Sequence, residues 1–199
     1  MLSSFKLFRH PFIRAILVSN LFSQFGIWVR NFSILLFVME RTGGDALAVS
    51  MISVAEYAPI FFFAFIGGVF ADRWLPRKTL IWCDILSAAS VFVVFSVLKT
   101  GVWEFTTLLS AILSQFAQPS GMKLFKNHVS DDLAQPAMSL LQMLFAVFMV
   151  LGPILGTFVY QAWGIAVSIG ITGAAFVLSA ASLVLIPSDR PMNAGSPSA

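Results

Sequence analysis

The sequence has little charge and almost no cysteine. Only 11% of its 199 residues are Asp, Glu, Lys or Arg, whereas 58% are hydrophobic. A water-soluble domain of this length needs a larger polar share to cover its surface, so the composition excludes an ordinary soluble protein. The single cysteine, Cys83, excludes an internal disulfide and a four-cysteine metal site. We therefore expect a lipid bilayer to be the solvent of this chain.

Motifs for common enzyme chemistry are also missing. The sequence has no Gly-x-x-x-x-Gly-Lys-Ser/Thr phosphate loop and no Gly-x-Ser-x-Gly nucleophile elbow. Two isolated histidines, His10 and His128, do not make a convincing metal site. The net charge of +3 comes from basic residues beside apolar runs, where they indicate membrane topology and not nucleic-acid binding. We expect no enzyme activity, no cofactor, no metal and no nucleic-acid partner.

Apolar stretches of about 20 residues, the length that crosses a bilayer, occur six times. They are Phe12–Met39, Ala46–Ala71, Thr79–Leu98, Val102–Met122, Ala137–Gln161 and Gly164–Ile186. Glycine and proline within the fifth stretch, and the break at Gln161–Gly164, separate the last two. The polar composition of residues 187–199 predicts a disordered tail. The sequence thus predicts an all-α integral membrane fold, with a six-helix bundle over residues 1–186.

Basic residues are unevenly distributed between the two ends of these spans. Arg41 and Lys99 lie at one end, and Arg30 lies within a span. Nine lie at the other end: Lys6, Arg9, Arg14, Arg73, Arg77, Lys78, Lys123, Lys126 and Arg190. Cytoplasmic loops carry the excess of Lys and Arg, so we expect a multi-pass protein of the cell inner membrane with both termini in the cytoplasm. No cleavable signal peptide is expected, because polar residues interrupt the first apolar run.

Four segments of the sequence resemble a known family. Gly68-Val69-Phe70-Ala71-Asp72-Arg73, followed by Arg77-Lys78, resembles the loop between helices two and three of major facilitator superfamily transporters. Ser23–Trp28, Phe116–Gly121 and Gly152–Gly156 resemble parts of helices one, four and five in its enterobactin-exporter and macrolide-efflux-like branch. The match departs from the family at Leu75 and Pro76, where Gly and a basic residue are usual. The fourth span also lacks the arginine that is common there.

The resemblance implies a fold, a function and a partner. Major facilitator transporters have twelve helices in two halves, each with a three-plus-three pseudo-repeat, and bind substrate at the midplane between the halves. This chain looks like an N-terminal half, so a missing C-terminal half, a second copy or a separately encoded partner would complete it. The implied function is secondary transport, as a proton-coupled antiporter for efflux of a small amphipathic compound. The alternative is a truncated or non-transporting six-helix membrane interaction protein.

Charged residues within the spans are candidates for function, because burying them in a membrane is costly. Arg30 and Glu56 lie roughly 13–15 Å from the outer ends of two antiparallel spans at ~1.5 Å per residue, so their positions allow an ion pair. Either Glu56 titrates during transport, or the pair only fixes helix packing. With Gln24, a polar residue expected to face the bundle, these two form the predicted substrate and proton pathway.

Two further groups of residues have predicted roles. The resemblance implies that the loop after the second span closes the cytoplasmic side; as an alternative, its basic residues only enforce topology. This predicted gate comprises Gly68, Asp72, Arg73, Arg77, Lys78 and Asp84. Within it, we expect the Asp84 carboxylate to bond to the basic loop or to the start of a neighbouring helix. Gly152, Pro153 and Gly156 predict a kink in the fifth helix and a close approach to a neighbouring helix.

Overall fold

The computed structural model describes residues 11–54, 56–58, 75–96, 112–113 and 131–184. Every regular element in this part of the chain is helical. The long helices are α2 (Pro11–Thr42), α4 (Pro76–Ser96) and α6 (Asp131–Val184), and a shorter apolar helix lies within Ala46–Ala58. The predicted all-helical class is therefore confirmed for the described residues. Most of the second and fourth predicted spans lies outside them, so the count of six helices stays a prediction.

A tight turn ends α2 and reverses the chain into the helix at Ala46–Ala58. Gly43 and Gly44 have φ angles of 64° and 83°, which favour glycine. The Gly44 backbone N–H donates to the Met39 carbonyl at 2.8 Å, as in a Schellman C-cap. Asp45 then caps the next helix, because its side-chain oxygen accepts from the Leu47 N–H at 3.1 Å. This turn lies inside the loop predicted between the first two spans.

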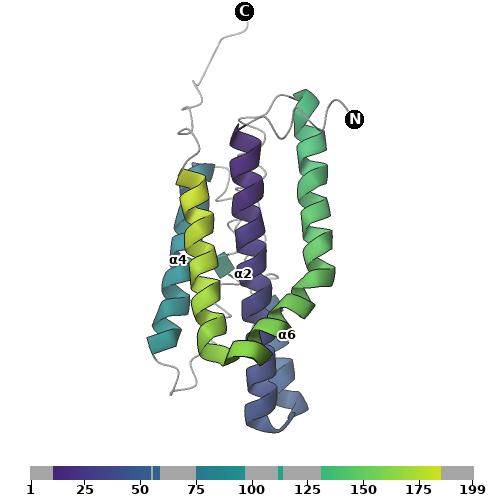
Figure 1. Cartoon of the computed structure of the whole chain (residues 1–199), viewed down its shortest axis with the longest axis vertical. Coiled ribbons are helices and arrows are strands. Elements are labelled where there is room, and N and C mark those ends of the chain that lie inside the picture. Colours follow the sequence, from purple (N-terminus) through teal and green to yellow (C-terminus); the bar gives the residue numbers. More distant parts are fainter. Residues whose placement is uncertain (1–10, 55, 59–74, 97–111, 114–130, 185–199) are drawn as a thin grey trace, which may run out of the picture.

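The helix α6 consists of two segments that run in opposite directions. Gly164 has φ 73° and ψ −179°, which is not helical, and Figure 1 shows α6 turning back there. The second segment, residues 165–184, extends about 30 Å at 1.5 Å per residue, enough to cross the apolar core of a bilayer. The predicted break at Gln161–Gly164 is thus confirmed. By length and composition, Phe12–Thr42 and Gln135–Val184 can cross a membrane.

Both α2 and α4 pack against α6, and α2 lies between the two segments of α6 in Figure 1. Near the start of α2, Phe12, Ile13 and Ile16 pack with Ala137 and Leu183 of α6. Ala88 and Val91 of α4 pack with Ile169 and Phe176 in its second segment. At the far end of α2, Ile34 and Val38 pack with Ile52.

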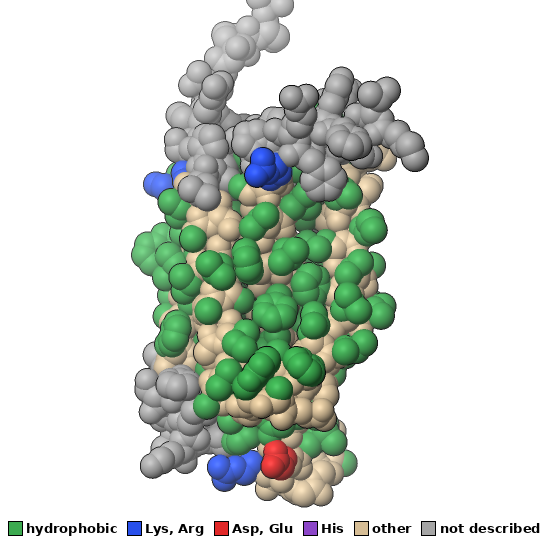
Figure 2. Space-filling model, in the orientation of Figure 1, with side chains coloured by type: hydrophobic (Ala, Val, Ile, Leu, Met, Phe, Trp, Pro, Cys, Tyr) green, Lys and Arg blue, Asp and Glu red, His purple; other side chains and the backbone are tan. Residues whose placement is uncertain are grey.

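The bundle buries several hydroxyl groups and exposes many large apolar side chains, unlike a water-soluble protein. Ser33, Ser168, Thr172 and Ser179 are completely buried, whereas the side chain of Met149 is 70% exposed. On the face seen in Figure 2, apolar side chains cover the middle and the visible charged groups lie toward the two ends. Buried hydroxyls and an apolar exterior fit a bilayer as solvent.

The starts of α2 and α4 lie at the same end of the bundle as the end of α6 (Figure 1). Arg77, in the first turn of α4, fixes this arrangement. Its Nε donates to the Leu183 carbonyl at 3.2 Å, and its Nη2 donates to the Val184 carbonyl at 2.7 Å. A cation at these carbonyls also matches the negative end of the helix dipole.

Candidate functional site

A chain of polar side chains joins α2 to the helix at Ala46–Ala58. Arg30 donates from Nε and Nη2 to the Asn31 side-chain oxygen, at 3.1 and 2.9 Å. Asn31 in turn donates from its side-chain nitrogen to the Glu56 carboxylate. Arg30 and Glu56 lie near each other, but the predicted ion pair does not form directly, because the Asn31 amide lies between the two side chains. We call this chain the Arg30–Asn31–Glu56 relay.

The relay leaves hydrogen-bonding capacity unused inside the bundle. Arg30 is only 4% exposed, and its buried Nη1 has no hydrogen-bond partner in the described part of the chain. One turn further along α2, the buried Ser33 hydroxyl also lacks a partner. The Glu56 carboxylate attracts the Arg30 guanidinium electrostatically, which offsets part of the cost of burying it. An unpaired buried donor is costly, so a polar ligand atom that accepts from Nη1 would be stabilised here.

Gln24 does not join this relay in the described structure. It is partly buried on α2, six residues before Arg30. This separation puts the two side chains about 120° apart around the helix axis. Its assignment to the substrate pathway therefore stays a prediction.

Of the predicted gate residues, Arg77, Lys78 and Asp84 are described. Gly68, Asp72 and Arg73 lie outside the described residues. Arg77 binds the end of α6, as shown above, and Lys78 is exposed.

The expected partners of Asp84 were wrong. Its carboxylate oxygens accept from Ser23 of α2 at 3.3 Å and from Ser179 of α6 at 2.6 Å. Both serines lie well inside their helices, and neither belongs to the basic loop or to a helix start. Asp84 lies two turns beyond Arg77 on α4 and faces the interior, which explains why it bonds to the bundle.

The predicted close approach at Gly152 and Gly156 is confirmed. A Cβ at Gly152 would overlap the Trp28 ring, and one at Gly156 would lie 2.8 Å from the Trp28 carbonyl oxygen. Trp28 stacks on Phe32 with ring centroids 5.8 Å apart. Pro153 lies between the glycines in a stretch that stays helical.

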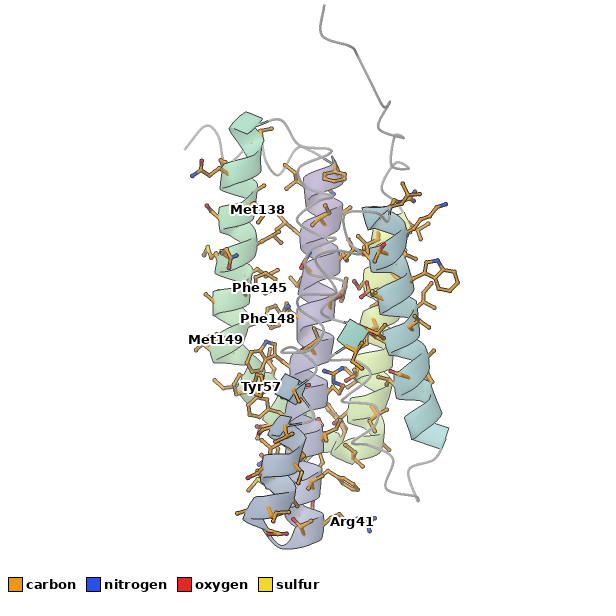
Figure 3. The ribbon with its side chains drawn as sticks, turned by 180° about the vertical axis from the view of Figure 1, so that it is seen from behind. Arg41, Tyr57, Met138, Phe145, Phe148 and Met149 are labelled. Atoms are coloured by element: carbon orange, nitrogen blue, oxygen red, sulfur yellow. The ribbon has the colours of Figure 1, made fainter. Side chains whose placement is uncertain are left out.

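Larger side chains precede this contact on α6. Phe145 and Phe148 point from α6 toward α2, whereas Met149 points outward (Figure 3). The first segment of α6 therefore packs against α2 on both sides of Arg30, at Trp28 and at Phe32, through glycines and aromatic rings.

The spacing of two serines on α2 is a sequence signal for a contact that was not among the predictions. Ser19 and Ser23 are four residues apart, so they share one face of α2. Their hydroxyls lie 2.8 and 2.7 Å from the Ser179 hydroxyl. Asn31 lies within the first predicted span, adjacent to Arg30. The spacing of polar residues in the sequence identifies groups that share a face of one helix. It does not identify their hydrogen-bond partners on another helix.

Comparisons with known proteins agree with these features. Residues 16–199 match the model of the Major Facilitator Superfamily. The chain is 30% identical over 161 residues to the uncharacterized MFS-type transporter YkuC of Bacillus subtilis (strain 168), covering 79% of this chain and 37% of that protein. It is 25% identical over 179 residues to the uncharacterized MFS-type transporter YfiS of the same organism, covering 89% of this chain and 42% of that protein. The chain thus spans about two-fifths of the length of these relatives. The finer resemblance to an enterobactin-exporter or macrolide-efflux-like branch stays a prediction.

Proposed function

Because this chain belongs to the major facilitator superfamily, we propose that it forms the N-terminal half of a proton-coupled secondary transporter for small amphipathic compounds. Membrane transport is the general function that the family supports. Export, proton coupling and a six-helix half with both termini in the cytoplasm are the specific parts of the proposal. A C-terminal half, from the same polypeptide, a second copy or a separate partner, would complete the pathway.

The Arg30–Asn31–Glu56 relay is the observation that carries this proposal. It joins an acid to a base inside a bundle whose exterior is apolar, where charged groups commonly belong to ion or substrate pathways. Glu56 is the group that would take up a proton. The unpaired Arg30 Nη1 would meet an acceptor atom of the substrate.

A physical coupling between proton and substrate follows from the charges. With Glu56 ionised, its negative charge balances Arg30, and a neutral or cationic amphipath meets little repulsion. Protonation of Glu56 removes that charge and changes its bond with Asn31, so the Arg30 charge becomes unopposed. A bound cationic group would then be repelled. Proton uptake would thereby favour substrate release, which is the coupling that an antiporter requires.

The opening step would involve the ends of the helices and not the relay itself. Arg77 connects the start of α4 to the end of α6, and the proposed gate residues Asp72 and Arg73 precede it in sequence. Rocking of one half against the other would break contacts that Asp72 and Arg73 make with the second half at the cytoplasmic side, whereas the Arg77 bonds lie within this half. Neither step forms or breaks a covalent bond.

Efflux of ethidium, a fluorescent amphipathic cation, tests this function in cells that produce the chain together with its second half or partner. We expect an uncoupler, which dissipates the proton gradient, to abolish efflux by the wild-type chain. Glu56→Gln should abolish the same efflux without an uncoupler, while the amount of protein in the membrane stays unchanged. Glu40→Gln is the matched control, because Glu40 is exposed at the far end of α2. Equal efflux by both variants would contradict the assignment of Glu56. Native mass in mild detergent distinguishes a second copy from a different partner.

A further inference from the structure

Three serines and one aspartate form a hydrogen-bonded cluster where α2, α4 and α6 meet. The Ser179 hydroxyl lies 2.8 Å from that of Ser19, 2.7 Å from that of Ser23 and 2.6 Å from Asp84 Oδ2. Ser23 lies 3.3 Å from Asp84 Oδ1. We propose that this serine–aspartate cluster is a proton-binding site, in which Asp84 is protonated while the three helices are packed as described. This goes beyond the proposed pathway, whose titrating group is Glu56.

The number of hydrogens in the cluster supports the proposal. The oxygens make four close contacts, and each contact needs one hydrogen between its two oxygen atoms. Each serine hydroxyl provides one hydrogen, and an ionised carboxylate provides none. With Asp84 ionised, three hydrogens therefore serve four contacts, whichever way the hydroxyls rotate. A proton on Asp84 provides the fourth, and every contact is then a hydrogen bond.

Among the described residues, no cation contacts the cluster to hold Asp84 ionised. On α4, the neighbouring titratable group is Cys83, and Arg77 and Lys78 lie about two turns away. On α2, the next charged residue along the face of Ser23 is Arg30, about 10 Å further along the helix. Residues 165–184 of α6 contain no charged side chain. Ser19 and Ser179 are buried, so within the described residues the carboxylate has hydroxyls as partners and no cation.

The position of the cluster connects proton binding to helix packing. Ser23, Asp84 and Ser179 come from α2, α4 and α6, and Asp84 is partly buried, which leaves it accessible to a proton. Loss of the proton removes one hydrogen from the cluster and leaves a charge in an interior of low polarity. Ionisation should therefore favour separation of α4 from the other two helices. Uptake of a proton should close the contact again.

Infrared difference spectroscopy of the full chain in lipid nanodiscs, comparing acidic and alkaline buffers, tests the site without any substrate. Among the carboxylic-acid carbonyl bands that titrate, we expect a band of Asp84 that is lost in Asp84→Asn and shifted in Ser179→Ala. The same band should persist in Glu56→Gln, so failure of the proposed transport function leaves this result intact. A spectrum in which Asp84→Asn keeps every titrating band would overturn the proposal, and so would a titration that follows sodium concentration and not pH.

Thermal unfolding supplies a second readout. The wild-type chain should lose stability as pH rises, because ionisation of Asp84 removes a hydrogen bond from the packed state. Asparagine can donate and accept as a neutral acid does, so Asp84→Asn should remove this pH dependence. If the unfolding temperature falls equally with rising pH in the wild type and in Asp84→Asn, the proposal is contradicted. If Asp84→Asn does not fold, the carbonyl band of Asp84 in Ser23→Ala and Ser179→Ala decides the question. A band that is unshifted in both variants overturns the proposal.

Discussion

The Trp28 indole on α2 lies directly against Gly152 on α6, in the space that a Cβ at residue 152 would occupy. This contact is one of the places where the two longest helices approach most closely. Because Arg30 follows Trp28 by two residues, the contact also fixes the rotation of α2 near the Arg30–Asn31–Glu56 relay. Packing at this position therefore helps to orient the proposed relay.

Gly152→Ala should destabilise the chain, because the added methyl group overlaps the Trp28 ring. Overpacking of this kind typically costs about 1–3 kcal/mol. Thermal unfolding in detergent measures the effect. Gly170→Ala is the matched control, because a Cβ at Gly170 has no atom within 4 Å and alanine favours a helix. Equal unfolding temperatures for the two variants would show that the close contact is absent.

Gly164→Ala should also lower stability, but for a conformational reason. The backbone at Gly164 has φ 73° and ψ −179°, a region that is nearly restricted to glycine. An alanine there should cost about 1–3 kcal/mol, although a Cβ would meet no neighbouring atom. The unfolding temperature should fall for Gly164→Ala and stay or rise for Gly170→Ala. An unchanged value for Gly164→Ala would mean that the chain does not reverse at this residue.

Asn31→Ala should impair both transport and stability, because it removes the amide between Arg30 and Glu56. Leaving their buried polar atoms without partners should cost about 1–3 kcal/mol. Ethidium efflux should fall to the level of the Glu56→Gln variant. Asn20→Ala is the control, because the Asn20 side chain donates only within its own helix, to the Ile16 carbonyl at 3.0 Å. Efflux by Asn31→Ala at the wild-type rate would exclude a role for Asn31 in the Arg30–Asn31–Glu56 relay.

Sequence reasoning predicted features that depend on composition along one helix. The glycines and proline of the fifth stretch, with the break at Gln161–Gly164, indicated the reversal in α6, and the depth of each residue in its span placed Arg30 near Glu56. The bridging role of Asn31 was not predictable in this way, because it depends on side-chain rotamers. The partners of Asp84 depend on how α2 and α6 rotate about their axes. Ser23 and Ser179 are 156 residues apart, and packing of whole helices brings them together.

The relay and the serine–aspartate cluster make different predictions about protons. Glu56 is bonded to a side chain that also binds a cation, whereas Asp84 is bonded to hydroxyls. Protonation of Glu56 should therefore change the charge that a substrate meets. Protonation of Asp84 should change the packing of three helices. Loss of coupling without loss of stability is expected for Glu56→Gln, and a change in the pH dependence of stability is expected for Asp84→Asn.

Proton movement driven by an amphipathic compound tests the central claim most directly. The chain and its second half or partner are reconstituted in liposomes that carry an internal acidic pH and a pH-sensitive dye. We expect ethidium added outside to cause proton release from wild-type and Glu40→Gln liposomes, and none from Glu56→Gln liposomes. Proton release at the same rate from all three would contradict proton coupling through Glu56.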